Sequence, residues 1–384
     1  MQTIGILLPR STYYETMGFE LYEGLRSGLK QLGHEDIRIV SENIGFGADK
    51  QQCYRSAEKL LLEDNASVVI AYIGHRTAQL LRPLFLAANR MLIVLDAGAN
   101  MPTEWPECPN ILYHSLHNAL GAWLAAKRAV ADGCKTGGMV TGYYDGGYLH
   151  TMGIYSGFIN AGGTITFNHA TGYKAEEFSM LPLKEQLEKD PGFALLTIFS
   201  AEFAEWYFAA IRDLFGEEND LNIYLPPYMF EETMLEKAPY PGNNAKGIAA
   251  WSRSLDTAEN KIFTETIRET GKALTLFTLL GWEGSRIISK VLELAAANKN
   301  NISQINAGLR SFEFTGPRGL VRVHPEKNTT ISPMYNATIA KSENGTCRVE
   351  IGSVIADPIA DFDEMSKLPL EGVTSSWFNS YVCI

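Results

Sequence analysis

Several polar and aromatic residues of this chain come directly after short apolar runs that are typical of buried strands. In open sheets of parallel strands, ligands bind beyond the carboxyl ends of the strands, near the point where the strand order reverses. Residues in such positions can bind a ligand, and here they fall into six loops. The loops are 9–17, 74–78 and 96–101 in the first part of the chain, and 142–148, 200–205 and 226–231 in the second.

The loop 74–78 carries residues suited to binding a carboxylate. A carboxylate needs several convergent N–H and hydroxyl donors, and the N-terminus of a helix supplies them. Thr77 is placed to cap the helix that begins at Ala78, which would leave its hydroxyl free to share with a ligand. A capping role without ligand contact is the alternative. Arg76 could bind a carboxylate through two parallel N–H groups, unless it is a solvated surface side chain.

An amino group on the ligand would need an acidic partner once it leaves water. Glu202, next to Ala201 in the loop 200–205, has the best position for this role, and Asp145 and Glu231 are alternatives. A solvated carboxylate favoured by the helix dipole is the other explanation of Glu202. Residues that could form apolar or aromatic walls of the site, if they do not pack in the core or at its rim, are Met17, Tyr13, Tyr14 and Tyr228.

The elements that must position these loops occur in two similar passes about 130 residues apart. Each pass opens with an apolar run and continues into an amphipathic helix. The runs are 4–9 and 138–142, and the helices are 18–33 and 146–161. Further helices are expected at 50–63, 77–89, 176–188 and 202–215, and strands at 37–40, 67–73, 91–95, 164–167, 194–199 and 221–225.

The pattern changes after the second pass. Residues 257–298 read as two long helices, and a region rich in Gly and Pro with strands at 312–314, 319–323, 334–340 and 347–355 follows. The late helices are expected to return to the first unit, with the last strands near a hinge. Candidate crossings between the two units are 114–118, 247–252 and 322–333. Three crossings would restrict the motion to hinge bending, which suits closure on a ligand.

Alternating strands and helices predict parallel sheets covered by helices on both faces. The expected fold is therefore α/β, with two doubly wound parallel-sheet lobes joined by a three-segment hinge. Lobe one is expected to comprise residues 1–117 and 250–325. Lobe two, with the hinge and the C-terminal strands, is expected to comprise residues 118–249 and 326–384.

Composition narrows the function classes. The chain has 384 residues and a formal net charge of −11, which argues against a nucleic-acid partner because phosphate binding favours a basic surface. No apolar run approaches the roughly 20 residues that span a bilayer, so direct membrane insertion is not expected. The five cysteines include no CxxC pair. Most are expected to be buried as small apolar side chains, and Cys347 and Cys383 could pair in an oxidising compartment.

Motifs of catalysis and cofactor binding are missing from the sequence. It contains no GxxxxGK[ST] or GxGxxG phosphate loop and no GxSxG nucleophile elbow. The segment His114–His117 with Cys108 upstream lacks a second ligand pair, so no metal site is expected. Glu202 and Glu205 read as an exposed helical face rather than a paired acid site. Neither a catalytic residue nor a cofactor is therefore predicted.

The order of elements resembles the type I periplasmic binding proteins, specifically the branched-chain amino-acid-binding (Leu/Ile/Val-binding protein-like) group of ABC-transporter solute receptors. The likeness covers nearly the whole chain, and the order and spacing of its motifs are more specific than any one of them. The stretches that carry it are 4–9 with 18–24, 73–77 with 95–102 (LDAGANMP), 145–148 (DGGY), and 280–285 (LGWEGS) with 314–319 (FTGPRG).

The resemblance implies roles for individual residues. Thr77, backbone donors around Ala97 and Gly98, and Asn100 would hold a ligand carboxylate from lobe one. Tyr148 would close over the ligand from lobe two. The implied ligand is an amino acid or a related small carboxylate.

The function implied is that of a non-enzymatic receptor that captures its ligand by hinge closure and delivers it to the membrane permease of an ABC transporter. Its location would be periplasmic or lipid-anchored outside the cytoplasm, with the leader missing from this chain. A cytosolic ligand sensor with the same fold is the alternative, and an α/β enzyme is a remote one. All three require that two hinged halves bury a guest molecule at their shared seam.

Overall fold

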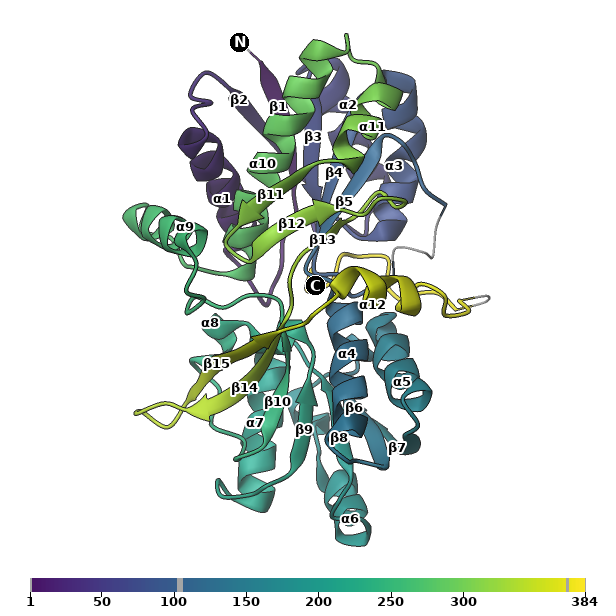
Figure 1. The fold of residues 1–384 in the computed structure, drawn as a ribbon, viewed down its shortest axis with the longest axis vertical. Helices are drawn as coiled ribbons and strands as arrows, with labels where there is room; N and C mark the ends of the chain where they lie inside the picture. Colours follow the sequence, from purple (N-terminus) through teal and green to yellow (C-terminus); the bar gives the residue numbers. More distant parts are fainter. Residues whose placement is uncertain (1, 102–105, 371–372, 384) are drawn as a thin grey trace.

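The computed structural model describes residues 2–101, 106–370 and 373–383 of the chain. The described residues form two α/β lobes stacked along the long axis of the molecule (Figure 1). The strand runs predicted from the sequence are present, and each lobe is built on its own sheet. The predicted α/β fold with two lobes is confirmed.

Lobe one contains five parallel strands in the order β2-β1-β3-β4-β5. Their side chains alternate between two apolar layers, because successive residues of a strand point to opposite faces. Ile4 and Ile6 of β1 face α1 and α10, whereas Leu7 faces α2 and α3. The strands are β1 (Thr3–Leu8), β2 (Arg38–Asn43), β3 (Val68–Tyr72), β4 (Met91–Asp96) and β5 (Ile111–Ser115). The helices are α1 (Met17–Gln31), α2 (Lys50–Leu62), α3 (His75–Ala88), α9 (Ala258–Glu269), α10 (Leu276–Ala297) and α11 (Ile302–Arg310).

The late helix α10 returns to lobe one and packs along α1, as the sequence predicts. Two glycines allow the helices to approach closely. A Cβ atom on Gly24 would lie 2.1 Å from the carbonyl oxygen of Thr278, and one on Gly281 would lie 2.2 Å from that of Leu21. This contact fixes the helix that begins at Met17, next to the loop after β1.

Lobe two contains seven strands in the order β15-β14-β10-β9-β8-β6-β7. Five are parallel, but β14 and β15 form an antiparallel hairpin on one edge, which departs from the purely parallel sheet that was predicted. The strands are β6 (Thr136–Thr141), β7 (Thr164–Ala170), β8 (Ala194–Ile198), β9 (Asn222–Leu225), β10 (Ala245–Ala249), β14 (Tyr335–Lys341) and β15 (Cys347–Val354). The helices are α4 (Asn118–Ala131), α5 (His150–Asn160), α6 (Leu181–Lys189), α7 (Ala201–Phe215) and α8 (Glu232–Leu235).

Short elements join the lobes or interrupt predicted helices. The predicted helix 176–188 is instead a turn, η3 (Ala175–Glu177), followed by α6, because Pro182 fits only the first turn of a helix. The predicted helix 146–161 begins at His150, after the turn η2 (Asp145–Gly147). The other short elements are η4 (Pro227–Phe230), α12 (Pro358–Met365) and a small sheet of β11 (Glu313–Gly316), β12 (Gly319–Val323) and β13 (Thr330–Ile331).

The chain passes between the lobes three times, after β5, after β10 and between β13 and β14. All five cysteines are free and buried, as expected for most of them, and the pairing that was considered possible for Cys347 and Cys383 is not formed. Cys347 lies in β15 of lobe two, where its thiol contacts the carbonyl oxygen of Pro239. Cys383 lies beside Met17 of lobe one, with 3.8 Å between the two sulfur atoms. Among the described residues, no helix is long and apolar enough to cross a bilayer.

Candidate ligand-binding site at the seam between the lobes

The carboxyl ends of the parallel strands in both lobes point toward a common seam (Figure 1). The loops that leave β1, β3 and β4 lie on one side, and the loops that leave β6, β8 and β9 lie on the other. This is the edge at which parallel sheets bind ligands. The six predicted loops therefore belong to one region of the molecule.

Residues 375–383, called the terminal segment from here on, lie in this seam. They approach lobe one through three hydrogen bonds to their main-chain carbonyls. Ser11 Oγ donates to the carbonyl of Val382 at 2.5 Å, and Tyr72 Oη donates to that of Tyr381 at 3.1 Å. Arg76 Nη1 donates to the carbonyl of Ser375 at 3.2 Å, and its guanidinium lies over the ring of Phe378.

Lobe two contacts the same segment from the opposite side. Tyr144 Oη donates to the carbonyl of Ser380 at 3.3 Å, and Tyr148 Oη donates to that of Asn379 at 3.3 Å. The indole Nε1 of Trp377 donates to the carbonyl of Tyr144 at 2.8 Å. The terminal segment thus bridges the two lobes, and part of the seam that was expected to receive a guest molecule holds the chain itself.

The side chain of Tyr381 fills an aromatic slot. Its ring stacks on Tyr144 with 6.0 Å between centroids and an interplanar angle of 3°. Tyr148, Tyr228 and His150 meet it edge-on at 5.0, 5.2 and 5.2 Å. Such edge-to-face and offset-stacked arrangements are the favourable geometries of aromatic pairs.

Asp145 lies at the end of this slot and is 1% exposed. Its Oδ1 accepts the hydroxyl hydrogen of Tyr381 at 2.6 Å, and its Oδ2 accepts the backbone N–H of Ser200 at 3.2 Å. Within the described ranges, it forms no ion pair. Burial raises the pKa of Asp145 to about 6, although the hydrogen bonds from Tyr381 and Ser200 oppose the shift. Asp145, predicted as an alternative to Glu202, is therefore a buried acid of the seam. Glu231, the other alternative, is buried as well, and its Oε2 accepts the backbone N–H of Met234 at 2.9 Å in the first turn of α8.

Four of the predicted site residues contact the terminal segment. Met17, at the first position of α1, lies against Cys383. Arg76 and Tyr148 bind main-chain carbonyls of the segment, and Tyr228 packs on Tyr381. The structure therefore brings these residues together around one segment, of which Ser375 and residues 380–383 are buried.

Thr77 does not have the local role that was predicted. The N-cap of α3 is Gly74, so Thr77 lies inside the first turn of the helix, not at its start. Its hydroxyl is fully buried and donates to the carbonyl of Gly47 at 3.2 Å. The helix begins at His75, two residues before Thr77. The ring of His75 is held there by Asp96, with 2.9 Å between Nε2 and Oδ2.

Ala97, Gly98 and Asn100 connect the lobes. The carbonyls of Ala97 and Gly98 accept N–H groups at the start of α4, at 3.0 and 2.8 Å. Asn100 Oδ1 accepts the backbone N–H of Leu149 at 3.3 Å, next to Tyr148. Each contact joins the end of β4 to an element of lobe two, so these residues set the distance between the two sides of the seam.

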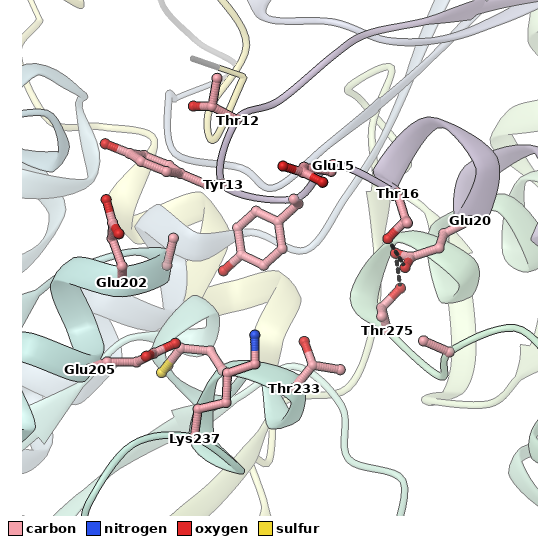
Figure 2. Close-up of a pocket in the computed structure, with 14 residues that line it drawn as sticks. Thr12, Tyr13, Glu15, Thr16, Glu20, Glu202, Glu205, Thr233, Lys237 and Thr275 are labelled. Atoms are coloured by element: carbon pink, nitrogen blue, oxygen red, sulfur yellow. Dashed lines mark hydrogen bonds between the residues drawn. The ribbon is translucent and has the colours of Figure 1, made fainter.

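A cavity of about 660 Å³ lies between the loop after β1 and the helices α7 and α8, and opens between the lobes (Figure 2). Ala201 and Glu202, two more predicted site residues, line it, and among the described residues no side-chain hydrogen bond joins either of them to the terminal segment. Glu202 is exposed to the cavity, together with Glu15 and Lys237. The wall also contains Thr12, Tyr13, Tyr14, Thr16, Glu20, Glu205, Thr233, Met234, Ala273 and Thr275.

The charges of this cavity are predominantly negative. Burial raises the pKa of Glu205, with Glu202 adding to the shift and Lys237 opposing it. Glu20 is held by the hydroxyls of Thr16 at 2.7 Å and Thr275 at 2.9 Å, the contacts drawn in Figure 2. Among the described lining residues, the carboxylates of Glu15, Glu202 and Glu205, which form no ion pair, and the ammonium of Lys237 are therefore available to a small polar molecule.

Sequence reasoning missed Ser11, Tyr72 and Tyr144 as seam residues. Each lies within or next to a strand-end loop, so its position was a usable signal. It also missed the terminal segment, which carries neither a strand nor a helix pattern. The only local signal was its richness in aromatic residues, with Trp377, Phe378 and Tyr381 within five positions. Within the described part of the chain, no group of His, Cys, Asp and Glu side chains could hold a metal ion.

Comparison with known proteins agrees with this architecture. The chain is 22% identical over 357 residues to a Leu/Ile/Val-binding protein homolog of Brucella abortus, covering 89% of this chain and 88% of the relative. The fold is similar to an ABC transporter substrate-binding protein from Sphaerobacter thermophilus, with a TM-score of 0.80, 20% identity and coverage of 95% and 99%.

Another similar structure is a solute-binding protein of an ABC transporter from Rhodopseudomonas palustris in complex with 4-hydroxybenzoate, with a TM-score of 0.77 and 17% identity, covering 93% of this chain and 97% of that one. Residues 2–345 match the family described as periplasmic binding protein, and this match ends before the terminal segment. Because the match covers most of the sequence, the chain belongs to the periplasmic binding protein family.

Proposed function

We propose that the chain is the solute-binding receptor of an ABC transporter and captures an amino acid or a related small carboxylate between its lobes. The observation that carries the proposal is the convergence of strand-end loops from both sheets on one seam that buries an aromatic group. Such a site binds its ligand by enclosure and needs no catalytic group. We infer that the protein is not an enzyme.

The chemistry of the seam supports a ligand with both charges. Glu202, Glu15 and the buried Asp145 favour an ammonium group, since a desolvated amine needs an acidic partner. Lys237 and the threonine hydroxyls of the cavity can hold a carboxylate. The names of the relatives are consistent with this class, because one is a Leu/Ile/Val-binding protein homolog and another is bound to 4-hydroxybenzoate.

We propose that ten residues form the site in two groups. The first group would contact the ligand and contains Met17, Arg76, Tyr148, Ala201, Glu202 and Tyr228. The second would position the loops around it and contains Thr77, Ala97, Gly98 and Asn100. The division follows their present contacts, because the second group bonds to neighbouring backbone rather than facing the cavity or the terminal segment.

We further propose that ligand binding changes the angle between two bodies, 1–117 with 250–325 and 118–249 with 326–384. The three crossings would act as the hinge. The closed form would present a surface to a membrane permease, which places the protein outside the cytoplasm, in the periplasm or on a lipid anchor. Fractionation of the native host, with the protein followed by antibody, tests this location, and recovery in the cytoplasm would contradict it.

Isothermal titration with aliphatic amino acids, aromatic amino acids and benzoates tests the binding function. At least one ligand should bind with a micromolar or tighter dissociation constant, and Glu202→Gln should weaken an amino acid more than a benzoate. Glu188→Gln, which changes an exposed carboxylate on α6, is the matched control and should have no effect. The proposal would be rejected if no compound of the three classes bound.

A further inference from the structure

The terminal segment is held in the seam in the manner of a bound ligand. It pairs with no strand of either sheet. Instead, side-chain donors of both lobes bind its main-chain carbonyls at residues 375, 379, 380, 381 and 382. Side-chain donors that converge on one buried segment from two lobes are the arrangement expected of a closed binding site.

Close approach of the segment depends on a glycine in the loop after β6. A Cβ atom on Gly147 would lie 2.1 Å from Nε1 of Trp377, which is far below contact distance. The neighbouring Gly146 differs, because a Cβ atom there would meet only Thr141 Oγ1, at 3.2 Å. The space that Trp377 occupies therefore requires a glycine at position 147 but not at position 146.

The slot around Tyr381 is suited to an aromatic ring that carries a hydroxyl group at its far end. Tyr144, Tyr148, Tyr228 and His150 surround the ring, and Asp145 accepts the hydroxyl hydrogen. A phenyl group without the hydroxyl would fill the same ring contacts but leave Asp145 with one donor fewer. Sites with a buried polar group reject ligands that leave it unpaired.

Two aromatic rings separate the slot from the cavity. Tyr228 packs on Tyr381 on one side and on Tyr14 on the other, with 6.0 Å between the centroids of Tyr14 and Tyr228. Tyr14 lines the cavity with Glu202 and Lys237. A compound with a hydroxyphenyl ring in the slot would therefore lie two ring contacts away from the carboxylates and the ammonium of the cavity.

Resting on the proposed function, we propose that the terminal segment is a built-in occupant of the ligand site, and that ligands bearing a 4-hydroxyphenyl group bind by displacing Tyr381 from its slot. Because the segment is tethered, it competes at a high effective concentration and lowers the apparent affinity of such a ligand. Displacement frees residues that now bridge the lobes, so ligand arrival also changes what holds the lobes together.

Thiol labelling of Cys383 measures displacement in the unaltered protein. Cys383 is fully buried at the end of the segment, and Cys134, buried in lobe two, serves as the internal reference. The probes are two matched pairs, 4-hydroxyphenylacetate with phenylacetate and L-tyrosine with L-phenylalanine. In at least one pair, we expect the hydroxylated compound to bind tenfold or more tightly than its partner, and to accelerate labelling of Cys383 at least fivefold without changing Cys134.

A variant tests the same displacement from the protein side. Gly147→Ala should dislodge Trp377, accelerate labelling of Cys383 without any ligand, and tighten binding of the hydroxylated probe. Gly146→Ala is the matched control and should behave as the unaltered chain. Equal labelling of Cys383 in the two glycine variants would count against the proposal.

The remaining outcomes separate this proposal from the receptor function. A hydroxylated probe that binds while labelling of Cys383 stays constant or slows would overturn displacement and leave the receptor function standing. The ligand class would be wrong if none of the four probes bound either the unaltered protein or Gly147→Ala while another amino acid or benzoate did. No binding by any compound in the wider screen would reject the receptor function itself.

Discussion

Two buried carboxylates, Glu283 at the junction of the lobes and Asp145 in the seam, have surroundings that shift their pKa values in opposite directions. Glu283 of α10 pairs with Arg318, whose Nη2 lies 2.6 Å from its Oε2, and accepts Nε2 of His114 at 3.0 Å. Among the described residues, the hydrogen bonds to the carboxylate of Asp145 come from a phenol and a backbone N–H. Both side chains are buried almost completely.

The pKa values follow from these partners. Burial by itself would raise the pKa of Glu283, but the guanidinium of Arg318 and the ring of His114 lower it to about 2. In the part of the chain that the structure describes, no cation compensates for the burial of Asp145, so its pKa rises to about 6. The first carboxylate is part of a fixed network that joins the small sheet to lobe one. Asp145 receives one of its two hydrogen bonds from Tyr381 of the terminal segment, so another hydroxyl donor could replace that partner.

The largest expected effect in this comparison comes from breaking the compensated pair. Arg318→Met should lower the free energy of unfolding by about 3–5 kcal/mol, because it leaves the Glu283 charge buried without a cation. Urea unfolding at pH 7 measures the loss. Arg322→Met, which removes an exposed pair with Glu313 on the same small sheet, is the control and should cost less than about 1 kcal/mol. Equal losses in the two variants would contradict the distinction.

The second effect is a difference in pH dependence. The folded pKa of Asp145 lies above the value of 3.8 of an unperturbed carboxyl, so the folded state binds its proton more tightly. Stability from this group is therefore fully present below pH 3.8 and is lost as the pH rises through 6, by about 3 kcal/mol in total. Glu283 has the opposite sign, since its lowered pKa makes stability fall when the pH drops below 4.5.

Asp145→Asn isolates the pH dependence of stability that comes from Asp145. The difference in unfolding free energy between the variant and the unaltered protein should shift in favour of the variant as the pH rises from 4 to 7, whatever the constant cost of the amide. Urea titrations at four or five pH values measure this difference. A difference that does not vary with pH would show that burial does not raise the pKa of Asp145.

A smaller effect is expected from the phenol that bonds to Asp145. Tyr381→Phe keeps the ring in its slot but removes the donor to a buried carboxylate, which should cost about 2 kcal/mol of local stability at pH 7. Labelling of Cys383 in the folded protein should become roughly thirtyfold faster as the segment opens more often. The exposed Tyr155→Phe is the control, and the prediction fails if both variants label at the same rate.

The smallest effect is expected on the lobe-one side of the segment. Ser11→Ala removes the hydroxyl that donates to the carbonyl of Val382, a neutral hydrogen bond worth about 1 kcal/mol. It also removes the two bonds that this oxygen accepts from the N–H groups of Tyr13 and Tyr14, but those lie within the loop of Ser11 and do not hold the terminal segment. Labelling of Cys383 should rise roughly fivefold. An effect larger than that of Tyr381→Phe would mean that the segment is anchored mainly by lobe one, contrary to the role given to Asp145.

Most of the fold could be predicted from the sequence because its signals are local. The alternation of apolar residues identified strands such as β3 and helices such as α2 within a residue or two. The loops that form the seam followed from strand ends alone. The prediction was less accurate where a local choice depends on distant contacts, as at Thr77, where Gly74 caps the helix and His75 pairs with Asp96.

The sequence by itself therefore determined two α/β lobes, the loops at their strand ends and the family of the chain, since periodic patterns and motif order carry that information. Only the tertiary structure decided which acids are buried and which groups lie beside them. Tyr381 meets Asp145 across 236 positions and Tyr72 across 309, and the terminal segment has no periodicity that announces those contacts. Burial and charge compensation are properties of the packed chain, so the difference between Asp145 and Glu283 could not be read from the order of residues.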